Sequence, residues 1–327
     1  MEHTEHAMIR KEHTEYMEKS KKCTEYAQNT ETEEYMNRIR SMLPRRYADS
    51  HKGTYGKALL VCGSEKYPGA AILACEGCIR SGAGLCALLS CKTVRGIVLS
   101  ALPDVICVDE DGLYNGNHAK RAKELPTDGY SAYLIGCGCG ISDDLGSLIY
   151  EVISSPGAPV VIDADGINSL AQDRERALDM LKTAEREVLL TPHPLEFSRI
   201  SGEDIKHINE DRDGSARGFA ERYGVNVLLK GHRSVICDKR GKTVINPSGS
   251  SALSKGGSGD VLAGVITGFI AQGADVFDAA VVGAYLHGIA GVNLSREFSD
   301  YGVAASDLPK QIAREICRLC PPDMVKQ

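Results

Sequence analysis

The sequence predicts an α/β protein of three layers, in which helices cover both faces of a mostly parallel sheet. From residue 51 onward, short and nearly continuous apolar segments alternate with segments of helical pattern. Strands without an alternating polar face are typical of parallel sheets that are buried on both sides. Several expected strands end in Gly, Asp or His. We therefore expect polar chemistry along the carboxyl edge of the sheet, where open α/β folds bind ligands.

Composition and charge narrow the classes of function. The chain has 327 residues, of which 43% are hydrophobic, and this is ordinary for one large domain or two small ones. Its net charge of −6 gives no indication of nucleic acid or an anionic membrane as a partner. The N-terminus carries no apolar leader, and no run of about 18 apolar residues occurs. We expect a cytoplasmic protein.

Residues 1–43 differ from the rest of the chain. The dipeptide Thr-Glu recurs at 4/5, 14/15 and 24/25, among Glu, Lys, His and Met. A ten-residue step does not return to the same face of a helix, and apolar residues are too sparse for a core-facing stripe. The sequence predicts a charged extension at 1–43, either a solvated helix or a disordered tail, followed by one domain at 44–327.

The twelve cysteines raise the question of a metal site. Two C-x-x-C pairs occur, Cys75 with Cys78 and Cys317 with Cys320, far apart in segments of helical pattern. A zinc site needs pairs that meet in space. Small buried thiols are the simpler interpretation, and any redox or metal role of the pairs stays open.

The expected elements follow one another as strand, turn and helix. Each expected strand is a short apolar run, and these runs cover 57–62, 85–91, 104–108, 132–135, 159–163, 188–191, 225–230, 235–238 and 243–246. The expected helices cover 70–80, 142–154, 215–223, 258–272, 277–295 and 306–319. A further helix is expected to begin near Pro194, because proline suits the first turn of a helix.

Two glycine motifs resemble nucleotide-binding loops, but each lacks one glycine that the loop requires. The loop Gly136-Cys-Gly-Cys-Gly140 follows a strand, but a dinucleotide fingerprint requires glycine where Ile141 stands. Gly241-Lys-Thr243 resembles the end of a P-loop, but the required earlier glycine is Ile236. The 136–140 loop still allows a ligand to approach the backbone closely, with a plain tight turn as the alternative.

Polar residues also follow three other strands. Asp163 and Asp165 could orient Mg²⁺ through water, or cap the following helix. Two prolines fix the chain around His193, which suggests a ligand role, and Glu196 suits the first turn of a helix. The turn 229–234 offers cationic and hydroxyl donors for a nucleotide, although an ordinary polar hairpin would look the same.

The glycine-rich segment 246–259 leads directly into an apolar helix with Asp260 in its first turn. A glycine-rich approach to a helix N-terminus leaves backbone N–H groups unpaired at the positive end of the helix dipole, which favours phosphate. A carboxylate at such a place is repelled by phosphate. Its presence therefore suggests proton transfer or metal handling, and a simple helix cap is the alternative.

Taken in order, these motifs resemble the ADP/ATP-dependent NAD(P)H-hydrate dehydratases, nucleotide-repair enzymes of the ribokinase-like superfamily. The resemblance is carried by segments rich in Gly, Pro, His and Asp, which are Ser50–Gly56, Gly63–Ala71, Gly136–Gly140, Asp163–Asp165, Thr191–Pro194, Leu229–Gly231 and Asn246–Gly264. It implies a three-layer ribokinase-like sandwich, and it covers nearly the whole of 44–327.

The resemblance implies a reaction in which the (6S) hydrate of NADH or NADPH loses water. ADP, or ATP as the alternative, phosphorylates the C6 hydroxyl, and loss of phosphate restores the nicotinamide and leaves AMP when ADP is the donor. Asp260 would be the base, and N–H groups of Gly257 and Gly259 would hold charge on the phosphoryl group. Mg²⁺ is implied, held through nucleotide phosphates and water with no direct protein ligand.

The resemblance also implies which residues contact each ligand. The hydrated dinucleotide would contact Ala70, a glycine of the loop (Gly138 or Gly140), His193 and Asp260. The adenine nucleotide would contact Lys230, Gly231, His232, Arg233, Ser234 and Gly259. The chain departs from the family pattern in three places, with Leu195 for the usual Gly, His232-Arg233-Ser234 for small-Gly-Thr, and Ser250-Ser251 for Asn-Pro.

Partners and alternatives follow from the same resemblance. Many relatives carry a fused epimerase domain, for which residues 1–43 are too short, so the expected functional partner is a separate NAD(P)H-hydrate epimerase. Relatives associate, often as tetramers, which implies a homo-oligomer. The alternatives are a ribokinase-like kinase of a vitamin precursor and a catalytically idle nucleotide-binding regulator. The intact Asp260 argues against the idle regulator.

Overall fold

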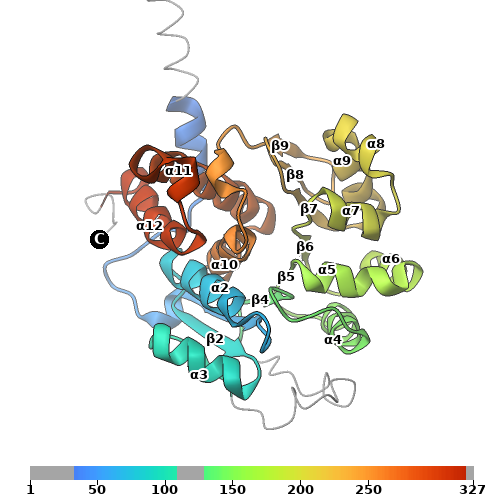
Figure 1. Ribbon diagram of the computed structural model, residues 1–327, viewed down its shortest axis with the longest axis horizontal. Helices are drawn as coiled ribbons and strands as arrows, with labels where there is room; N and C mark the ends of the chain where they lie inside the picture. The colour runs from blue at the N-terminus through green and yellow to red at the C-terminus, as the bar shows by residue number, and fades with distance from the viewer. Residues whose placement is uncertain (1–32, 109–128, 322–327) are drawn as a thin grey trace, which may run out of the picture. The chain divides into compact units, whose positions relative to one another are not determined.

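The computed structural model describes residues 33–108 and 129–321 (Figure 1). The chain divides after Met42 into two compact units. In the first unit, residues 33–42 form a helix. The Thr-Glu repeat of the expected extension lies outside the described residues, so the nature of that extension stays a prediction.

The second unit, Leu43–Gln327, is built on a nine-stranded sheet with the order β3-β2-β1-β4-β5-β6-β7-β8-β9. The strands are β1 Lys57–Val61, β2 Leu85–Leu89, β3 Ile106–Cys107, β4 Ala132–Ile135, β5 Val160–Ile162, β6 Val188–Leu190, β7 Asn226–Leu229, β8 Val235–Cys237 and β9 Thr243–Ile245. Pairing is parallel from β3 through β7, and antiparallel between β7, β8 and β9. Every expected strand is present, most of them shorter at the ends, and the mostly parallel sheet is confirmed.

The helices of this unit are α2 Pro68–Arg80, α3 Lys92–Ala101, α4 Asp143–Ile153, α5 Asp165–Leu170, α6 Arg174–Lys182, α7 Pro194–Ser201, α8 Ile205–Glu210, α9 Arg212–Tyr223, α10 Ser258–Ala271, α11 Val276–Gly302 and α12 Leu308–Leu319. The sequence prediction missed α3, α5, α6 and α8. The reason is plainest for α6 and α8, because α6 buries only Ala177 and Leu181 and α8 buries only Ile208. So few inward-facing residues give no recognisable helical periodicity.

Helices cover both faces of the sheet (Figure 1). One face carries α2, α3, α10, α11 and α12, and the other carries α4 to α9. The chain runs outward from β1 to β2 and β3, and then returns to β4 on the other side of β1. The strand order therefore reverses between β1 and β4. Open α/β sheets bind ligands outside the carboxyl ends of their strands at such a reversal.

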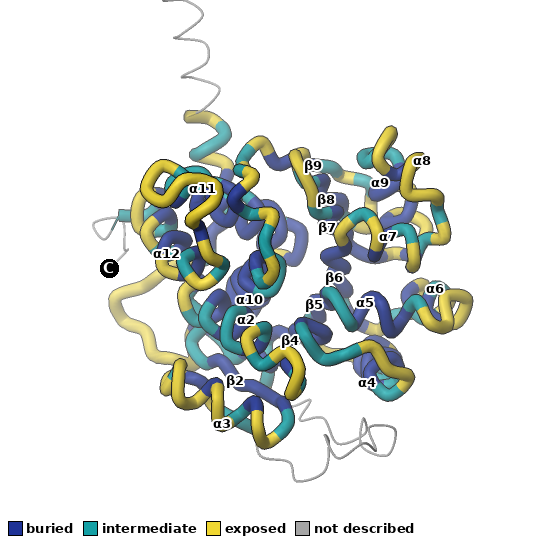
Figure 2. Tube along the Cα trace, viewed as in Figure 1, coloured by how far each residue is buried: buried dark blue, intermediate teal, exposed yellow. Residues whose placement is uncertain are grey.

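The position of α10 is fixed by close packing against α2. Residues 261–271 of α10 are all buried, and the tube of α10 is dark blue in Figure 2. A Cβ on Gly264 would lie 2.0 Å from the Ala74 carbonyl oxygen, and one on Gly77 would lie 2.6 Å from that of Val261. The two helices thus pack backbone against backbone. This contact holds the N-terminus of α10 at the carboxyl edge of the sheet.

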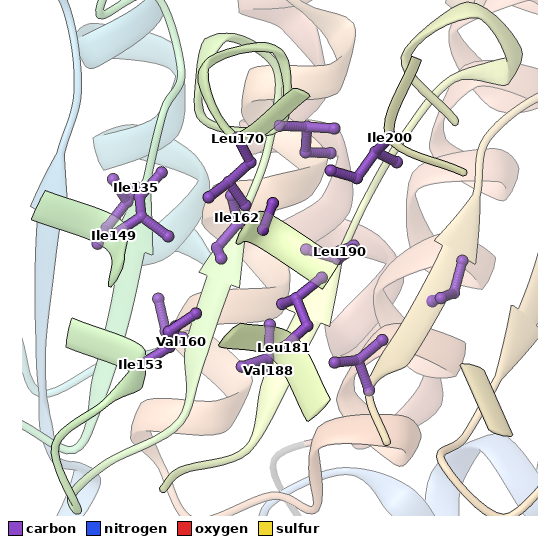
Figure 3. Packing of buried hydrophobic residues seen from close by; sticks show 14 of the residues in the cluster. Ile135, Ile149, Ile153, Val160, Ile162, Leu170, Leu181, Val188, Leu190 and Ile200 are labelled. Carbon is purple, nitrogen blue, oxygen red and sulfur yellow. The ribbon is translucent and has the colours of Figure 1, made fainter. Parts of the chain in front are cut away.

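The opposite face of the sheet is filled by a cluster of branched apolar side chains (Figure 3). Ile135, Ile162 and Leu190 project from neighbouring strands toward α4 to α7. Ile149, Leu181 and Ile200 project back from those helices. Burying an aliphatic side chain of this size stabilises the fold by about 1.5–3 kcal/mol. The cluster anchors the strands whose ends carry the polar residues.

Helix α11 is long and apolar enough to cross a membrane by length and composition, but 78% of its most apolar window is buried inside the protein. It packs against α10 and α12. A core helix has these same properties, so the burial of α11 explains its apolar composition.

Candidate active site

The carboxyl ends of neighbouring strands bring the expected site segments together. Strands β1, β4, β5, β6 and β7 lie side by side, and the residues that follow them are Cys62, Gly136, Asp163, Thr191 and Lys230. The N–H of Lys230 donates to the Pro192 carbonyl at 2.8 Å, which ties the ends of β6 and β7 to each other. These expected site segments therefore meet at the carboxyl edge of the sheet.

Helix α10 begins at this edge with backbone donors that are free. Its N-cap is Gly257, which adopts a left-handed φ of 91° and offers no side chain. The N–H of Ser258 donates to the Lys255 carbonyl at 3.3 Å. Within the described residues, the N–H groups of Gly257, Gly259 and Asp260 donate to no acceptor. Together with the helix dipole, these donors form a site for an anion such as phosphate.

Asp260 lies in the first turn of α10 and is partly exposed. Burial, reinforced by the negative charge of Asp163, raises the pKa of Asp260 to about 7, while the Cys137 thiol and Lys230 partly oppose the shift. A carboxylate with such a pKa can accept and release a proton near neutral pH. The electrostatics of Asp260 are those of a general base.

The carboxylate of Asp163 is tied to two neighbouring strands. Its Oδ1 accepts hydrogen bonds from Thr191 Oγ1 and from Lys230 Nζ, each at 2.7 Å. Asp163 is only 1% exposed. The N-cap of α5 is Ala164, and no side chain caps that helix. Of the two roles that the sequence left open for Asp163, helix capping is therefore wrong.

Lys230 places a partly buried cation against the first turn of α10. Although burial opposes its charge, the carboxylates of Asp163 and Glu196 raise the pKa of Lys230 to about 12. A Cβ on Gly259 would lie 3.4 Å from Lys230 Nζ and 4.0 Å from Asp163 Oδ2. The Lys230 ammonium and the free N–H groups of α10 therefore border one space, and an anion there could contact both.

Cys137 is a buried thiol among these carboxylates. Its Sγ lies 3.6 Å from Asp163 Oδ2 as a hydrogen-bond donor. Sγ and one oxygen each of Asp163 and Asp260 lie within 4.8 Å of one another. A hydrogen bond with Cys62, burial and the two negative charges raise the pKa of Cys137 well above its usual value. The thiol therefore stays protonated at neutral pH.

His193 is the N-cap of α7, and it forms a capping box with Glu196. His193 Nδ1 accepts the N–H groups of Leu195 and Glu196, each at 3.2 Å, and Glu196 Oε2 accepts the His193 N–H at 2.8 Å. Burial and the charge of Lys230 lower the pKa of His193. The ring is therefore neutral at pH 7, and because Nδ1 accepts, Nε2 carries the proton.

Two of the expected substrate contacts touch each other at the reversal of strand order. Gly138 adopts a φ of 66°, and a Cβ there would lie 2.6 Å from Ala70 Cβ. Gly140 is placed differently, because its N–H donates to Asp165 Oδ2 at 2.8 Å and no atom outside its neighbours lies within 4 Å of its Cβ position. The structure brings Gly138 to Ala70 and Gly140 to Asp165.

Arg212 of α9 holds the backbone of the turn after β7. The guanidinium donates at 2.8 Å to each of three carbonyls, those of Leu229, Lys230 and His232. Ser234 Oγ donates to the Gly231 carbonyl at 3.1 Å. His232 and Arg233 are exposed. The turn is thus rigid in its backbone, and its exposed side chains are available to a ligand.

These residues suit a Mg²⁺ that is held through water rather than by the protein directly. Mg²⁺ takes six oxygen ligands and keeps several waters. Among the described residues, the one converging group of possible ligands includes the Cys137 thiol, which Mg²⁺ disfavours. Asp163 Oδ1 is already occupied by Lys230, and Asp165 Oδ2 by Gly140. Carboxylate oxygens close to an anion site could instead accept hydrogen bonds from the waters that surround the ion.

Sequence reasoning missed three residues of this site. Cys137 was counted among the inert thiols, although its position between glycines after a strand could have drawn attention to it. The second partner of Lys230 is Glu196, 3.9 Å away, and the sequence suggested for it only a helix-turn role. Arg212 carries no local signal, because the turn that it contacts follows the whole of α9 and strand β7 along the chain. Of the C-x-x-C pairs, Cys75 and Cys78 are buried as expected, but Cys317 is exposed.

Comparison with known proteins gives a consistent result. A protein-family model described as NAD(P)H-hydrate dehydratase matches residues 58–314. The ADP-dependent (S)-NAD(P)H-hydrate dehydratase of Bacillus subtilis is 33% identical over 284 residues, which cover 86% of this chain and 96% of that protein. The crystal structure of an ADP/ATP-dependent NAD(P)H-hydrate dehydratase from Bacillus subtilis, co-crystallised with ATP/Mg²⁺, has a TM-score of 0.77 at 32% identity and covers 87% of this chain and 97% of that one.

The chain spans about half the length of other curated relatives. The bifunctional NAD(P)H-hydrate repair enzyme of Moorella thermoacetica is 35% identical over 272 residues, which cover 82% of this chain and 51% of that protein. The similarity therefore concerns one half of a longer protein in that case.

Proposed function

Because this chain belongs to the NAD(P)H-hydrate dehydratase family, we propose that it restores NADH or NADPH from the (6S) hydrate at the expense of ADP. A phosphoryl group passes from ADP to the C6 hydroxyl of the hydrate, which leaves AMP. Phosphate then departs as the nicotinamide double bond forms again. The observation that carries this proposal is Asp260, whose pKa of about 7 and place beside free N–H groups suit phosphoryl transfer to a hydroxyl.

Asp260 acts as the general base in this proposal. It takes the proton of the C6 hydroxyl as the hydroxyl oxygen attacks the phosphorus of the donor. A base with a pKa near the working pH combines a sufficient ionised fraction with a sufficient affinity for the proton. Burial and the neighbouring Asp163 give Asp260 that pKa.

The N-terminus of α10 and Lys230 stabilise the charge on the transferred group. The N–H groups of Gly257 and Gly259 are fixed by the helix, so they need no reorganisation during the reaction. Lys230 remains protonated because Asp163 and Glu196 raise its pKa, and it borders the same turn. The absence of a side chain at Gly259 lets the phosphoryl group approach both.

We assign the substrate contacts to the edge of the sheet between β1 and β4, where the strand order reverses. Ala70 and Gly138 touch each other there, and they present backbone and a methyl group to the hydrated dinucleotide. His193 contributes the neutral ring, whose Nε2 lies 3.2 Å from Glu196 Oε1. Gly138 is preferred to Gly140 because the N–H of Gly140 is already bonded to Asp165.

The nucleotide contacts are assigned to Gly259 and to the turn that Arg212 holds in place, with Lys230, Gly231, His232, Arg233 and Ser234. Mg²⁺, bound to the nucleotide phosphates and water, would neutralise their charge.

We assign ADP as donor, with ATP as the alternative, because the Bacillus subtilis relative is named ADP-dependent and the related crystals contained ATP/Mg²⁺. We further propose a cytoplasmic homotetramer that works with a separate NAD(P)H-hydrate epimerase.

The experiment is to incubate the purified chain with hydrated NADH, Mg²⁺ and either ADP or ATP, and to follow the return of NADH absorbance. We expect NADH to return with ADP, in step with AMP formation, and not without nucleotide. No return with either donor would favour a vitamin-precursor kinase or an idle regulator. Return with ATP alone would make the donor assignment wrong and leave the reaction in place.

A further inference from the structure

Three potential metal ligands converge in the candidate active site from three separate segments. Cys137 comes from the loop after β4, Asp163 from the end of β5 and Asp260 from the first turn of α10. The Cys137 sulfur and one oxygen of each carboxylate lie within 4.8 Å of one another. Cys137 and Asp163 are buried and Asp260 is partly exposed, so an ion could enter from the side of Asp260.

The distance between Cys137 Sγ and Asp163 Oδ2 matches that of two ligands on one tetrahedral ion. Zinc binds sulfur at about 2.3 Å and carboxylate oxygen at about 2.1 Å, so a tetrahedral ion separates the two ligands by about 3.6 Å. The distance from Cys137 Sγ to Asp163 Oδ2 is 3.6 Å. An ion could take the place of the thiol proton with little movement of either residue.

Of the two oxygens of Asp163, Oδ2 is the one that Thr191 and Lys230 leave unused. Thr191 and Lys230 both donate to Asp163 Oδ1. In the described part of the chain, the only donor to Asp163 Oδ2 is the Cys137 thiol. A metal ion on Oδ2 would therefore leave both existing hydrogen bonds of the carboxylate intact.

Charge also favours a cation here. Two carboxylates, those of Asp163 and Asp260, share one close cation, Lys230. When a divalent ion binds, Cys137 releases its proton to solvent and becomes a thiolate, with no change of oxidation state. The thiolate and the two carboxylates bring three negative charges to the ion, and Lys230, which Glu196 also approaches at 3.9 Å, lies beside them. Opposite charges that lie together are cheaper to bury than a lone charge.

From these observations we propose that Cys137, Asp163 and Asp260 form a site for a thiophilic divalent cation such as Zn²⁺ or Cd²⁺, with water as the fourth ligand. Thiolate with carboxylates selects Zn²⁺ or Cd²⁺ over Mg²⁺. An occupied site withdraws Asp260 from proton transfer and so inhibits the enzyme. That consequence rests on the proposed function, whereas binding of the ion does not.

The test measures binding in the full chain carrying Cys317→Ser and Cys320→Ser, because that C-x-x-C pair includes an exposed thiol that could bind the ion as well. Cd²⁺ is added, and the thiolate-to-metal charge-transfer absorption is followed. We expect the absorption to saturate at one ion per chain, in the presence of excess Mg²⁺. Adding Cys137→Ser should abolish it and weaken binding at least roughly 10- to 100-fold, the loss seen even for outer-shell changes at zinc sites.

Cys139→Ser is the matched control, since Cys139 lies on the same loop with its Sγ 3.2 Å from the Val61 carbonyl. It should keep the absorption. The proposal is overturned if the starting protein shows no such absorption at one equivalent, or if Cys137→Ser retains it. In a second arm, Zn²⁺ should inhibit NADH recovery and a chelator should reverse this. A protein that binds Cd²⁺ in this way but recovers no NADH would contradict the proposed function alone.

Discussion

Lys230 Nζ lies 2.7 Å from Asp163 Oδ1, although the two residues are 67 positions apart and follow different strands. The Asp163 side chain is 1% exposed and that of Lys230 19%, so this is a largely buried ion pair. Both members also act on Asp260, whose pKa Asp163 raises and Lys230 lowers. One contact therefore connects the stability of the fold with the chemistry of the site.

Lys230→Met should lower the free energy of unfolding by about 3–5 kcal/mol, because it leaves the Asp163 charge buried without its partner. Urea unfolding measures this loss. Adding Asp163→Asn to the Lys230→Met variant removes the unpaired buried charge and should restore part of the stability. Lys239→Met, which breaks the more exposed pair with Glu187, should cost no more than about 1 kcal/mol. Equal losses in the two single variants would contradict the buried-pair interpretation.

Asp260→Asn should reduce the rate of NADH recovery by about 10²- to 10⁴-fold, which is the usual contribution of a general base. The affinity for ADP, measured by calorimetry, should change little, because the backbone N–H donors of α10 remain. Asp143→Asn is the matched control, since Asp143 also lies in the first turn of a helix, at an exposed position of α4. Normal turnover in Asp260→Asn would show that another group is the base.

The raised pKa of Asp260 gives two expected pH dependences. The value of kcat/KM should rise as pH increases through about 7, because Asp260 must be ionised to accept a proton. Stability should change in the opposite direction. The folded chain holds this proton more tightly than the unfolded chain, where the pKa is about 3.8, so this contribution to stability is lost as pH rises from about 4 to about 7.

Asp260→Asn separates this effect from other titrations. The free energy of unfolding of Asp260→Asn minus that of the original chain should be lowest near pH 4. As the pH rises to about 8, this difference should increase by about 1.4 kcal/mol for each unit by which folding raises the pKa of Asp260. Urea unfolding at both pH values measures the change. A difference that is independent of pH would mean that the pKa of Asp260 is close to that in the unfolded chain.

Gly138→Ala should raise KM for the hydrated dinucleotide more than Gly140→Ala does. Both positions have a left-handed φ, so both variants bear a similar conformational cost of about 1–2 kcal/mol. Only at Gly138 would the new Cβ collide with Ala70, at 2.6 Å. Steady-state kinetics and thermal unfolding of the two variants distinguish a shared loss of stability from a specific loss of substrate affinity. Equal KM values would remove the reason for preferring Gly138.

Arg212→Ala should weaken ADP binding, because the turn 230–234 loses the three hydrogen bonds that hold its carbonyls. Each of these charged hydrogen bonds contributes about 1.5–3 kcal/mol, so some loss of stability is also expected. Arg217→Ala is the control on the same helix, where Arg217 pairs with Asp213 at the surface. Calorimetry with ADP gives the affinities. Unchanged affinity in Arg212→Ala would place the nucleotide away from this turn.

Much of the fold could be predicted from the sequence, because its signals are local. Most strands are short runs of buried apolar residues, the edge strands β3 and β9 being the more exposed ones, and a strand occurs in every segment where one was expected. Helices α6 and α8 escaped prediction because they bury too few residues to show a period. For the site, the glycine approach to α10 and the polar residues after the strands also lie within single segments, and the resemblance to a known family depends on their order.

Local runs of apolar residues and backbone chemistry are enough to predict the α/β architecture, and they point to the carboxyl edge of the sheet and to Asp260 as the candidate site. Folding is needed to show that Lys230 pairs with Asp163, that Gly138 rather than Gly140 meets Ala70, and that Cys137 lies beside two carboxylates. These relationships join residues from different strands. The pKa of Asp260 depends on burial and on charges brought near by folding, and neither is fixed until the strands are side by side.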